Sequence, residues 1–233
     1  GWHYKHWVGP FYPDIMKSEE FLEHYASLFS TAEINNTFYS LPKETTLKLW
    51  KKTTPKHFRF SVKASRYITH MKKLKDPEDT LSSLLNGVAP LASKIHIILF
   101  QLPPKWRCNI ERFSGFLEHL PGDYRYVFEF RDPSWINDDI LTLLEKKNMT
   151  FCIYELNGYL SPKHITSDIV YIRLHGPEAA YQGRYSKETL AGWAGAVHQW
   201  AEEEKEIYCY FDNDEKGYAP QNALELKEMV EDS

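Results

Sequence analysis

The stretch at residues 168–176, DIVYIRLHG, is a short apolar run that ends in polar residues, and the same pattern recurs along the chain. The further examples are residues 31–39 (TAEINNTFY), 57–65 (HFRFSVKAS), 95–104 (IHIILFQLPP), 124–131 (YRYVFEFR) and 206–214 (EIYCYFDND). Near-continuous apolar runs of this kind are typical of parallel strands that are buried on both faces. Ligands of α/β proteins bind at the carboxyl ends of such strands, so the polar ends indicate where function should be sought.

Segments with the 3.6-residue spacing of helices separate these runs. We expect helices near residues 21–29, 45–52, 81–91, 110–120, 140–147, 190–200 and 222–230, with Asp76-Pro77 and Ser186 as start signals. With residues 150–154 (TFCIY) as a further strand, strands and helices alternate from residue 31 onward. Alternation demands parallel pairing through right-handed crossovers.

We therefore predict an α/β fold, a single (β/α)8 TIM-type barrel domain over residues 1–233. Seven predicted strands imply an eighth at or before residue 1, so we expect the first strand to be truncated in this chain. An open doubly wound sheet is the alternative, but no Gly-rich phosphate loop follows an early strand.

Composition narrows the classes of function. Of the 233 residues 42% are hydrophobic, yet no apolar stretch approaches the roughly 20 residues of a membrane span. The N-terminal GWHYKHW lacks the features of a signal peptide, and the three cysteines form no C-x-x-C pair. These features predict a cytoplasmic protein without disulfides; the oligomeric state is left open.

The formal net charge of −4 gives no overall electrostatic reason to expect a nucleic-acid partner. One basic run, residues 70–75 (HMKKLK), has the composition of a phosphate-contacting loop, although such runs are more often solvated. A nucleic acid is therefore the less favoured partner, after a small polar or anionic molecule.

Side chains alternate between the two faces of a strand, so residues that share parity with the polar ends should line one face. In a barrel that face points to the mouth of the lumen. The predicted inward set is Glu33, Asn35, Lys63, Gln101, Glu129, Arg131, Arg173, His175 and Asn213. Mutual neutralisation in a polar core layer is the alternative for each charged member, because buried charges are commonly paired.

The chemistry of this set favours proton transfer on a neutral or anionic ligand. Glu129 and His175 are the candidate catalytic residues, as a carboxylate beside cations and an imidazole that titrates near neutrality. Arginine suits fork-like capture of phosphate or carboxylate, and Gly176 would let a ligand approach the backbone closely. Loop aromatics such as Tyr39 and Trp135 offer apolar faces to a sugar ring, unless they merely close the barrel mouth.

No cofactor is implied by the sequence, and a metal site is not favoured. A transition-metal site needs more than one convergent imidazole, and magnesium needs several oxygen ligands. A divalent metal stays an alternative because Asp132, Glu155, Asp212 and Asp214 would add carboxylates if the local register differs.

The chain resembles the YecE-like family, widely labelled as a domain of unknown function. The resemblance rests on ordered motifs over nearly the whole chain: GWHYKHW, EINNTFY, FRFSVKAS, LFQLPP, FEFRDPSW, YIRLHG and YFDND. It implies a TIM-type barrel that is loosely related to sugar isomerases. Two departures stand out, because the strand that usually precedes the Gly-Trp pair is absent and Asp212 occupies a position where Asn is common.

The leading hypothesis is an enzyme with isomerase-like proton transfer on a small carbohydrate-like ligand. In it Glu129 and His175 exchange protons, the cations Lys63, Arg131 and Arg173 hold oxygens, and polar partners orient hydroxyls. Cleavage or repair of nucleic-acid phosphodiesters is one alternative, and a non-catalytic metabolite-binding module is the other.

Overall fold

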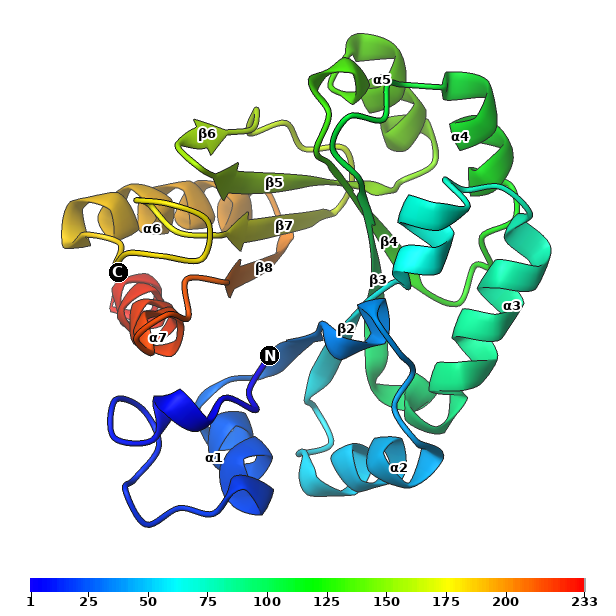
Figure 1. The fold of residues 1–233 in the computed structure, drawn as a ribbon. Coiled ribbons are helices and arrows are strands. Elements are labelled where there is room, and N and C mark those ends of the chain that lie inside the picture. The colour runs from blue at the N-terminus through cyan, green and yellow to red at the C-terminus, as the bar shows by residue number, and fades with distance from the viewer. Residues whose placement is uncertain (233) are drawn as a thin grey trace. The chain divides into compact units, whose positions relative to one another are not determined.

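The computed structural model describes residues 1–232, and the expected fold class is confirmed. Seven parallel strands alternate with helices, as in a (β/α)8 TIM-type barrel (Figure 1). The chain divides into two compact units, here called unit 1 (residues 1–2 and 22–149) and unit 2 (residues 3–21 and from 150 onward). Whether the whole chain acts as one domain stays a prediction.

Unit 1 contains four parallel strands that pair in chain order, β1 (Thr31–Ile34), β2 (Arg59–Lys63), β3 (Ile95–Leu102) and β4 (Arg125–Phe130). The helices around them are α1 (Phe21–Leu28), α2 (Glu44–Thr53), α3 (Pro77–Val88), α4 (Ile110–Leu117) and α5 (Asp138–Lys146). Short helical turns of unit 1 are η3 (Asn36–Phe38), η4 (Tyr67–Met71), η5 (Ala89–Lys94) and η6 (Pro133–Trp135), whereas η2 (Ser18–Glu20), which precedes α1, belongs to unit 2. Every expected strand and helix of this region is present.

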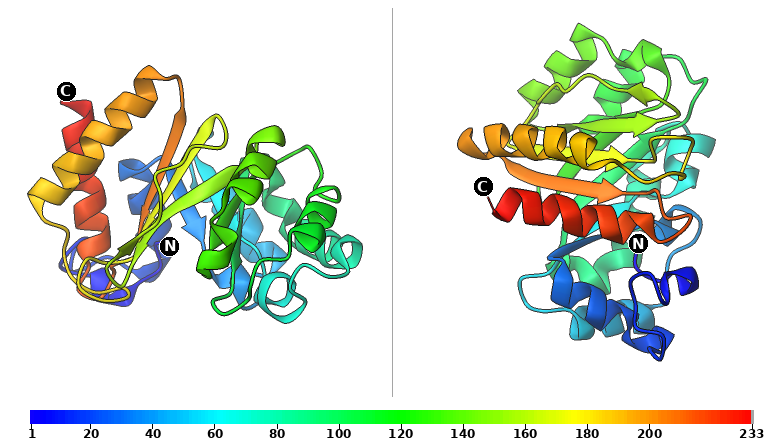
Figure 2. Two further views of the ribbon diagram at one scale, coloured as in Figure 1. Left: turned by 90° about the horizontal axis from the view of Figure 1, so that it is seen from above. Right: turned by 90° about the vertical axis from the view of Figure 1, so that its left-hand side faces the viewer.

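Unit 2 contains the parallel strands β5 (Thr150–Leu156), β7 (Ile169–Leu174) and β8 (Glu206–Phe211). Its helices are η1 (Lys5–Trp7), α6 (Lys187–Glu202) and α7 (Tyr218–Glu231), and α6 and α7 lie side by side next to β8 (Figure 2). The two-residue strand β6 (Tyr159–Leu160) pairs antiparallel with β5 and was not expected, because its pattern is too short to read from sequence.

Both predicted helix starts are present, but only one of the two residues caps its helix through its side chain. Ser186 caps α6 as predicted, since its side chain accepts a hydrogen bond from the Thr189 backbone. Asp76 and Pro77 open α3 as predicted, with Asp76 at the N-cap and the proline in the first turn. The Asp76 backbone is left-handed (φ 50°), and its carboxylate pairs with Lys72 Nζ at 2.7 Å and makes no hydrogen bond to the helix. Within the described residues no eighth strand precedes β1, because residues 1–4 are irregular. None of the helices described is long and apolar enough to cross a membrane.

Strand β4 confirms the expected division of its two faces. Phe128 lies edge-on to Phe113 of α4, with ring centroids 5.0 Å apart, and Phe130 stacks on Trp135 at 5.4 Å. This parity therefore packs under the helices. Glu129, which lies between the two phenylalanines, points to the opposite face, as side-chain alternation requires.

Lys94 is a buried cation that fastens the C-terminal end of α2. Its Nζ donates to the Thr54 carbonyl (2.6 Å), the Thr54 hydroxyl (2.8 Å) and the Pro55 carbonyl (2.7 Å). Burial, followed by the nearby charges of Arg59 and Lys51, lowers the pKa of Lys94. Three acceptors offset the cost of removing this ammonium group from water.

Lys94→Met should therefore destabilise the protein. It removes the ammonium group that donates to these three acceptors while keeping most of the apolar stem, so the free energy of unfolding should fall by about 1–3 kcal/mol. Urea denaturation measures the change, with Lys51→Met on the exposed face of α2 as the matched control. Equal losses in the two variants would show that the Lys94 hydrogen bonds contribute nothing.

Candidate functional site

A buried charged cluster lies at the carboxyl ends of β7 and β8 in unit 2. Arg173 Nη2 lies 2.9 Å from Asp212 Oδ2, and His175 Nδ1 lies 3.1 Å from the same oxygen. Arg173 is 2% exposed and His175 is 1% exposed. We call Arg173, His175 and Asp212 the β7–β8 cluster.

The electrostatics of this cluster favour an ionised Asp212. Burial raises the pKa of the Asp212 carboxyl, but the Arg173 guanidinium and the hydrogen bond and charge of His175 together lower it well below its ordinary value. The carboxylate thus stays charged at neutral pH, and it balances the arginine.

The position of Arg173 also determines how the His175 ring is used. Arg173 Nη1 lies 3.4 Å from His175 Nε2, and a guanidinium only donates hydrogen bonds. Nε2 therefore presents its lone pair to Arg173, and Nδ1 faces Asp212 Oδ2 as an ion-pair contact at 3.1 Å that does not meet hydrogen-bond geometry. The carboxylate holds the tautomer in which Nε2 is the nitrogen that can exchange a proton.

The adjoining end of β5 supplies a carboxyl group with an altered pKa. Burial raises the pKa of Glu155, and a hydrogen bond from Tyr185 partly offsets this effect. The Tyr185 hydroxyl also accepts a hydrogen bond from the Gly176 backbone at 3.0 Å, and burial raises the pKa of Tyr185 strongly. The His175 backbone donates to the Glu155 carbonyl at 3.0 Å, which ties β5 to the end of β7.

Two expectations for unit 2 need correction. The cluster includes Asp212 and not Asn213, whose Nδ2 donates to the Gly183 carbonyl (2.9 Å) and to Asn222 Oδ1 (3.0 Å). Gly176 does not make room for a ligand: at its φ of 117° an added Cβ would lie 2.3 Å from the Gln182 carbonyl oxygen. The chain's own loop occupies that space.

In unit 1 the predicted residues lie at or near the ends of β1–β4. Arg131 Nε forms a short ion pair with Glu129, which is fully buried. Gln101 lies opposite Glu129 in register, and Glu33, which is 1% exposed, lies opposite Ser61. The expected alternative of mutual neutralisation thus describes the Glu129–Arg131 pair.

Lys63 lies in a cationic cluster with Arg66 and His70. Its Nζ sits 4.4 Å from the centroid of the Phe38 ring, and His70 packs edge-on against the same ring at 5.0 Å. Burial lowers the pKa of His70, and the charges of Lys63 and Arg66 lower it further. The charges of Lys63 and Arg66 make the surroundings of His70 positive, and an anion at Lys63 stays a prediction.

The aromatic and amide residues predicted for the site differ in how deeply they are buried. Trp135 is fully buried, stacks on Phe130 and donates from Nε1 to the Trp106 carbonyl at 2.6 Å, so it has the setting of a core residue. Tyr39 is 74% exposed. Asn35 is half-buried, and its Oδ1 is buried with no hydrogen-bond partner among residues 1–232.

Sequence reasoning missed the central role of Asp212, although a usable signal was present. In register, Arg173 pairs with Tyr210, and Tyr171 contacts Tyr210 with ring centroids 5.1 Å apart. Position 212 therefore shares the face of Tyr210 and Arg173, whereas position 213 belongs to the other parity. Counting alternate positions onward from Tyr210 would have placed Asp212 on the face of Arg173. Among the described residues, no group of at least three His, Cys, Asp or Glu side chains is placed to hold a metal ion.

Comparison with known proteins gives consistent matches along the chain. The family described as "Protein of unknown function DUF72" matches residues 1–233. The UPF0759 protein YunF of Bacillus subtilis is 23% identical over 94% of this chain and 90% of its own length. The UPF0759 protein YecE of Escherichia coli is 34% identical over 49% of this chain and 42% of its own length.

Crystal structures of two DUF72 family proteins resemble this chain. The protein from Thermotoga maritima is 29% identical, with a TM-score of 0.87 over 99% of this chain and 96% of the other. The protein from Enterococcus faecalis is 24% identical, with a TM-score of 0.78 over 90% of this chain and 93% of the other, and this likeness concerns the fold alone.

Arg173→Met should reduce stability in a pH-dependent way. It leaves the buried Asp212 carboxylate without its guanidinium, which typically costs about 3–5 kcal/mol. A lowered folded-state pKa gives Asp212 a stabilising contribution above its unfolded pKa of about 3.9, and that contribution is lost as the pH falls through the folded pKa. The difference between parent and variant should thus be largest near pH 7 and shrink below about pH 4.

Urea denaturation across this pH range tests the pair. Lys48→Met is the matched control, because it breaks the exposed Lys48–Glu44 pair (2.6 Å), which water screens, and should unfold like the parent. A pH-independent loss in Arg173→Met would mean that packing, and not the ion pair, explains its effect.

Lys63→Met should raise the pKa of His70 toward its ordinary value of about 6.5, because one of the two cations that lower it is removed. Burial is the larger cause and remains, so the recovery should be partial. An NMR titration of the imidazole measures the change, and Lys51→Met serves as a control that should leave His70 as in the parent. An unchanged His70 in Lys63→Met would contradict the cationic cluster.

Proposed function

This chain belongs to the DUF72 family of proteins of unknown function, and we propose that it is an enzyme that moves a proton on a small polar, carbohydrate-like molecule. The observation that carries the proposal is the β7–β8 cluster, in which a carboxylate orients a buried imidazole 3.1 Å away beside an arginine. Such an arrangement is typical of general acid–base sites.

The proposed reaction is an isomerisation next to a carbonyl group. His175 Nε2 takes a proton from the carbon beside the carbonyl, and the electron pair moves to the carbonyl oxygen. Arg173 donates hydrogen bonds to that oxygen as its negative charge develops. The hydroxyl proton on the deprotonated carbon passes to the former carbonyl oxygen, so that a new C=O bond forms at that carbon. Nε2 then returns its proton to the former carbonyl carbon, and Asp212 stabilises the transient imidazolium until it does.

Ligand binding is part of this mechanism, because in the free protein the Arg173 guanidinium lies against the lone pair of His175 Nε2. The Nη1–Nε2 distance of 3.4 Å is long for a hydrogen bond, so little is lost when the guanidinium turns to another acceptor. A carbonyl or carboxylate oxygen of the ligand would be that acceptor. Binding would thereby expose the lone pair that accepts the proton.

Glu155 is a second candidate for proton exchange in unit 2. Its raised pKa places a carboxyl group closer to the working range of a general acid, and Tyr185 orients it. Glu129, the other carboxylate expected from the sequence, serves as a base only when a ligand draws Arg131 away, since the two form an ion pair. The roles of Glu129 and of the other unit 1 residues stay predictions.

The two alternative functions, cleavage or repair of nucleic acid and non-catalytic binding of a metabolite, have less support. The basic run at residues 70–75 is partly neutralised, because Lys72 pairs with Asp76 at 2.7 Å, which weakens the case for nucleic acid. A non-catalytic binding module would use the same arginine but would not need the Asp212–His175 contact. Proton transfer is therefore the preferred reading.

The test combines a ligand screen with one substitution. Thermal shifts with sugar phosphates and sugar acids should identify a ligand, and NMR in D2O should then detect deuterium entering that ligand beside its carbonyl. His175→Asn should slow this exchange by about 10²- to 10⁴-fold while the ligand still binds. His57→Asn, at an exposed position before β2, is the matched control. Exchange at the parent rate in His175→Asn would refute the proposal.

A further inference from the structure

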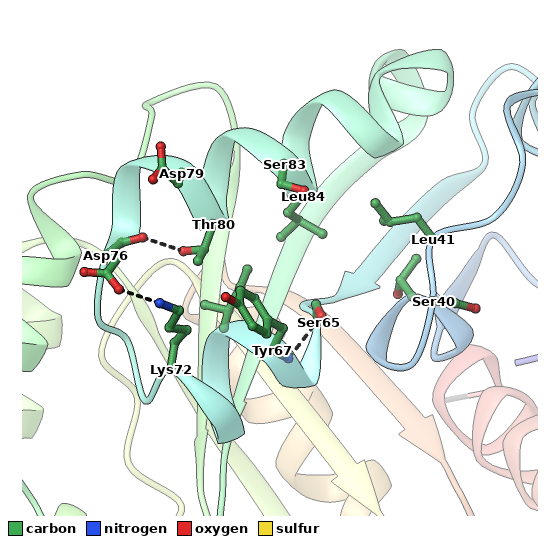
Figure 3. Close-up of a pocket in the computed structure, with 12 residues that line it drawn as sticks. Ser40, Leu41, Ser65, Tyr67, Lys72, Asp76, Asp79, Thr80, Ser83 and Leu84 are labelled. Atoms are coloured by element: carbon green, nitrogen blue, oxygen red, sulfur yellow. Dashed lines mark hydrogen bonds and ion pairs between the residues drawn. The ribbon is translucent and has the colours of Figure 1, made fainter.

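A cavity of about 290 Å³ opens in unit 1 between α3, η4 and the segment that follows η3 (Figure 3). None of the residues that line it belongs to the β7–β8 cluster. Leu41, Ile68 and Leu84 supply its apolar surface, and the ring of Tyr67, which is 45% exposed, forms one side. The size fits a single small ring, because ligand pockets start near 300 Å³.

The polar lining offers both donors and acceptors. Ser65 Oγ accepts a hydrogen bond from the Tyr67 backbone at 3.1 Å, so its hydroxyl hydrogen can donate to a ligand. Thr80 donates to the Asp76 carbonyl at 3.1 Å, which leaves its oxygen as an acceptor. Ser83, exposed on α3, has no hydrogen-bond partner within residues 1–232.

The charges of the lining argue against an anion. Lys72 Nζ is already paired with Asp76 at 2.7 Å, and Asp79 adds a further carboxylate without a salt bridge in the part of the chain that is described. The charged lining residues are thus one cation and two carboxylates. A neutral ligand meets no repulsion there, and its hydroxyl groups can satisfy the carboxylate oxygens.

The backbone around the cavity is unusual in two ways. Residues Tyr67–Met71 form a π-helical turn, a rare element that occurs frequently at functional sites. Lys73, Leu74 and Asp76 follow it with φ values of 48°, 64° and 50°, in the left-handed region that non-glycine residues rarely adopt. Such strain persists where a binding site requires the geometry, and here it sets the positions of Lys72 and Asp76.

We propose that this cavity binds a neutral, ring-shaped molecule with several hydroxyl groups, of the hexose, pentose or cyclic polyol class. The Tyr67 ring and the leucines cover the C–H face of such a ring, while serines, Lys72 and Asp79 bind its hydroxyls. The site goes beyond the proposed proton-transfer function and shares no residue with it.

Saturation-transfer NMR with D-glucose, D-xylose and myo-inositol tests the site directly, with inorganic phosphate as the anionic comparison. At least one neutral ring should bind, and phosphate should not displace it. Ser83→Phe fills the cavity and should weaken this probe's binding at least about tenfold. Ser82→Phe adds the same ring at the neighbouring exposed position of α3 outside the lining, and its affinity should match the parent.

Two further variants separate loss of binding from loss of folding. Tyr67→Leu keeps an apolar side chain but removes the ring face, and Asp79→Asn keeps the size but removes the charge; both should fold and weaken the probe. His175→Asn should bind the probe as the parent does, so this proposal and the proposed enzyme function fail separately. Absence of binding by all three neutral probes, or equal binding by Ser83→Phe and Ser82→Phe, would overturn the inference.

Discussion

The burial of charge at strand ends is the constraint on which the rest of this protein depends. A charged group in a protein interior is tolerated only with a partner, and here partners lie two residues apart on one strand face. Glu129 and Arg131 form such a pair at the end of β4. Arg173 and His175 share a face at the end of β7, where Asp212 of β8 joins them.

This pairing explains how one arrangement serves stability and chemistry together. Hydrophobic residues would fill these positions more stably, so the cost of desolvating the charges is a reason to look for function. At the β7–β8 cluster each polar atom that could act on a ligand is held by a neighbour in the free protein. A ligand that offers a better acceptor to Arg173 can therefore bind and release His175 Nε2 in the same step.

The sequence predicted most of the fold because its strand and helix patterns differ clearly in period. All seven parallel strands followed from continuous apolar runs, whereas β6, with two residues, has no pattern of its own. Side-chain contacts were less predictable. The prediction placed Asn213 in the inward set, but its amide nitrogen donates to the Gly183 carbonyl and to Asn222 Oδ1. Asp76 precedes α3 as expected from the sequence, but its carboxylate pairs with Lys72 and makes no hydrogen bond to the helix.

The identity of residue 212 changes which ligand the cluster prefers. With Asn213 in the site, Arg173 would be an uncompensated cation and a strongly anionic ligand would be favoured. With Asp212 ionised 2.9 Å from the guanidinium, the two charges cancel. A ligand with several negative charges would then meet the carboxylate as well as the arginine. A carbonyl oxygen, or a single carboxylate that contacts only Nη1, would accept hydrogen bonds from Arg173. It would meet less repulsion from Asp212, which lies beside Nη2. Under the proposed function, we expect the cluster to bind a sugar or sugar acid in preference to a multiply charged phosphate ester.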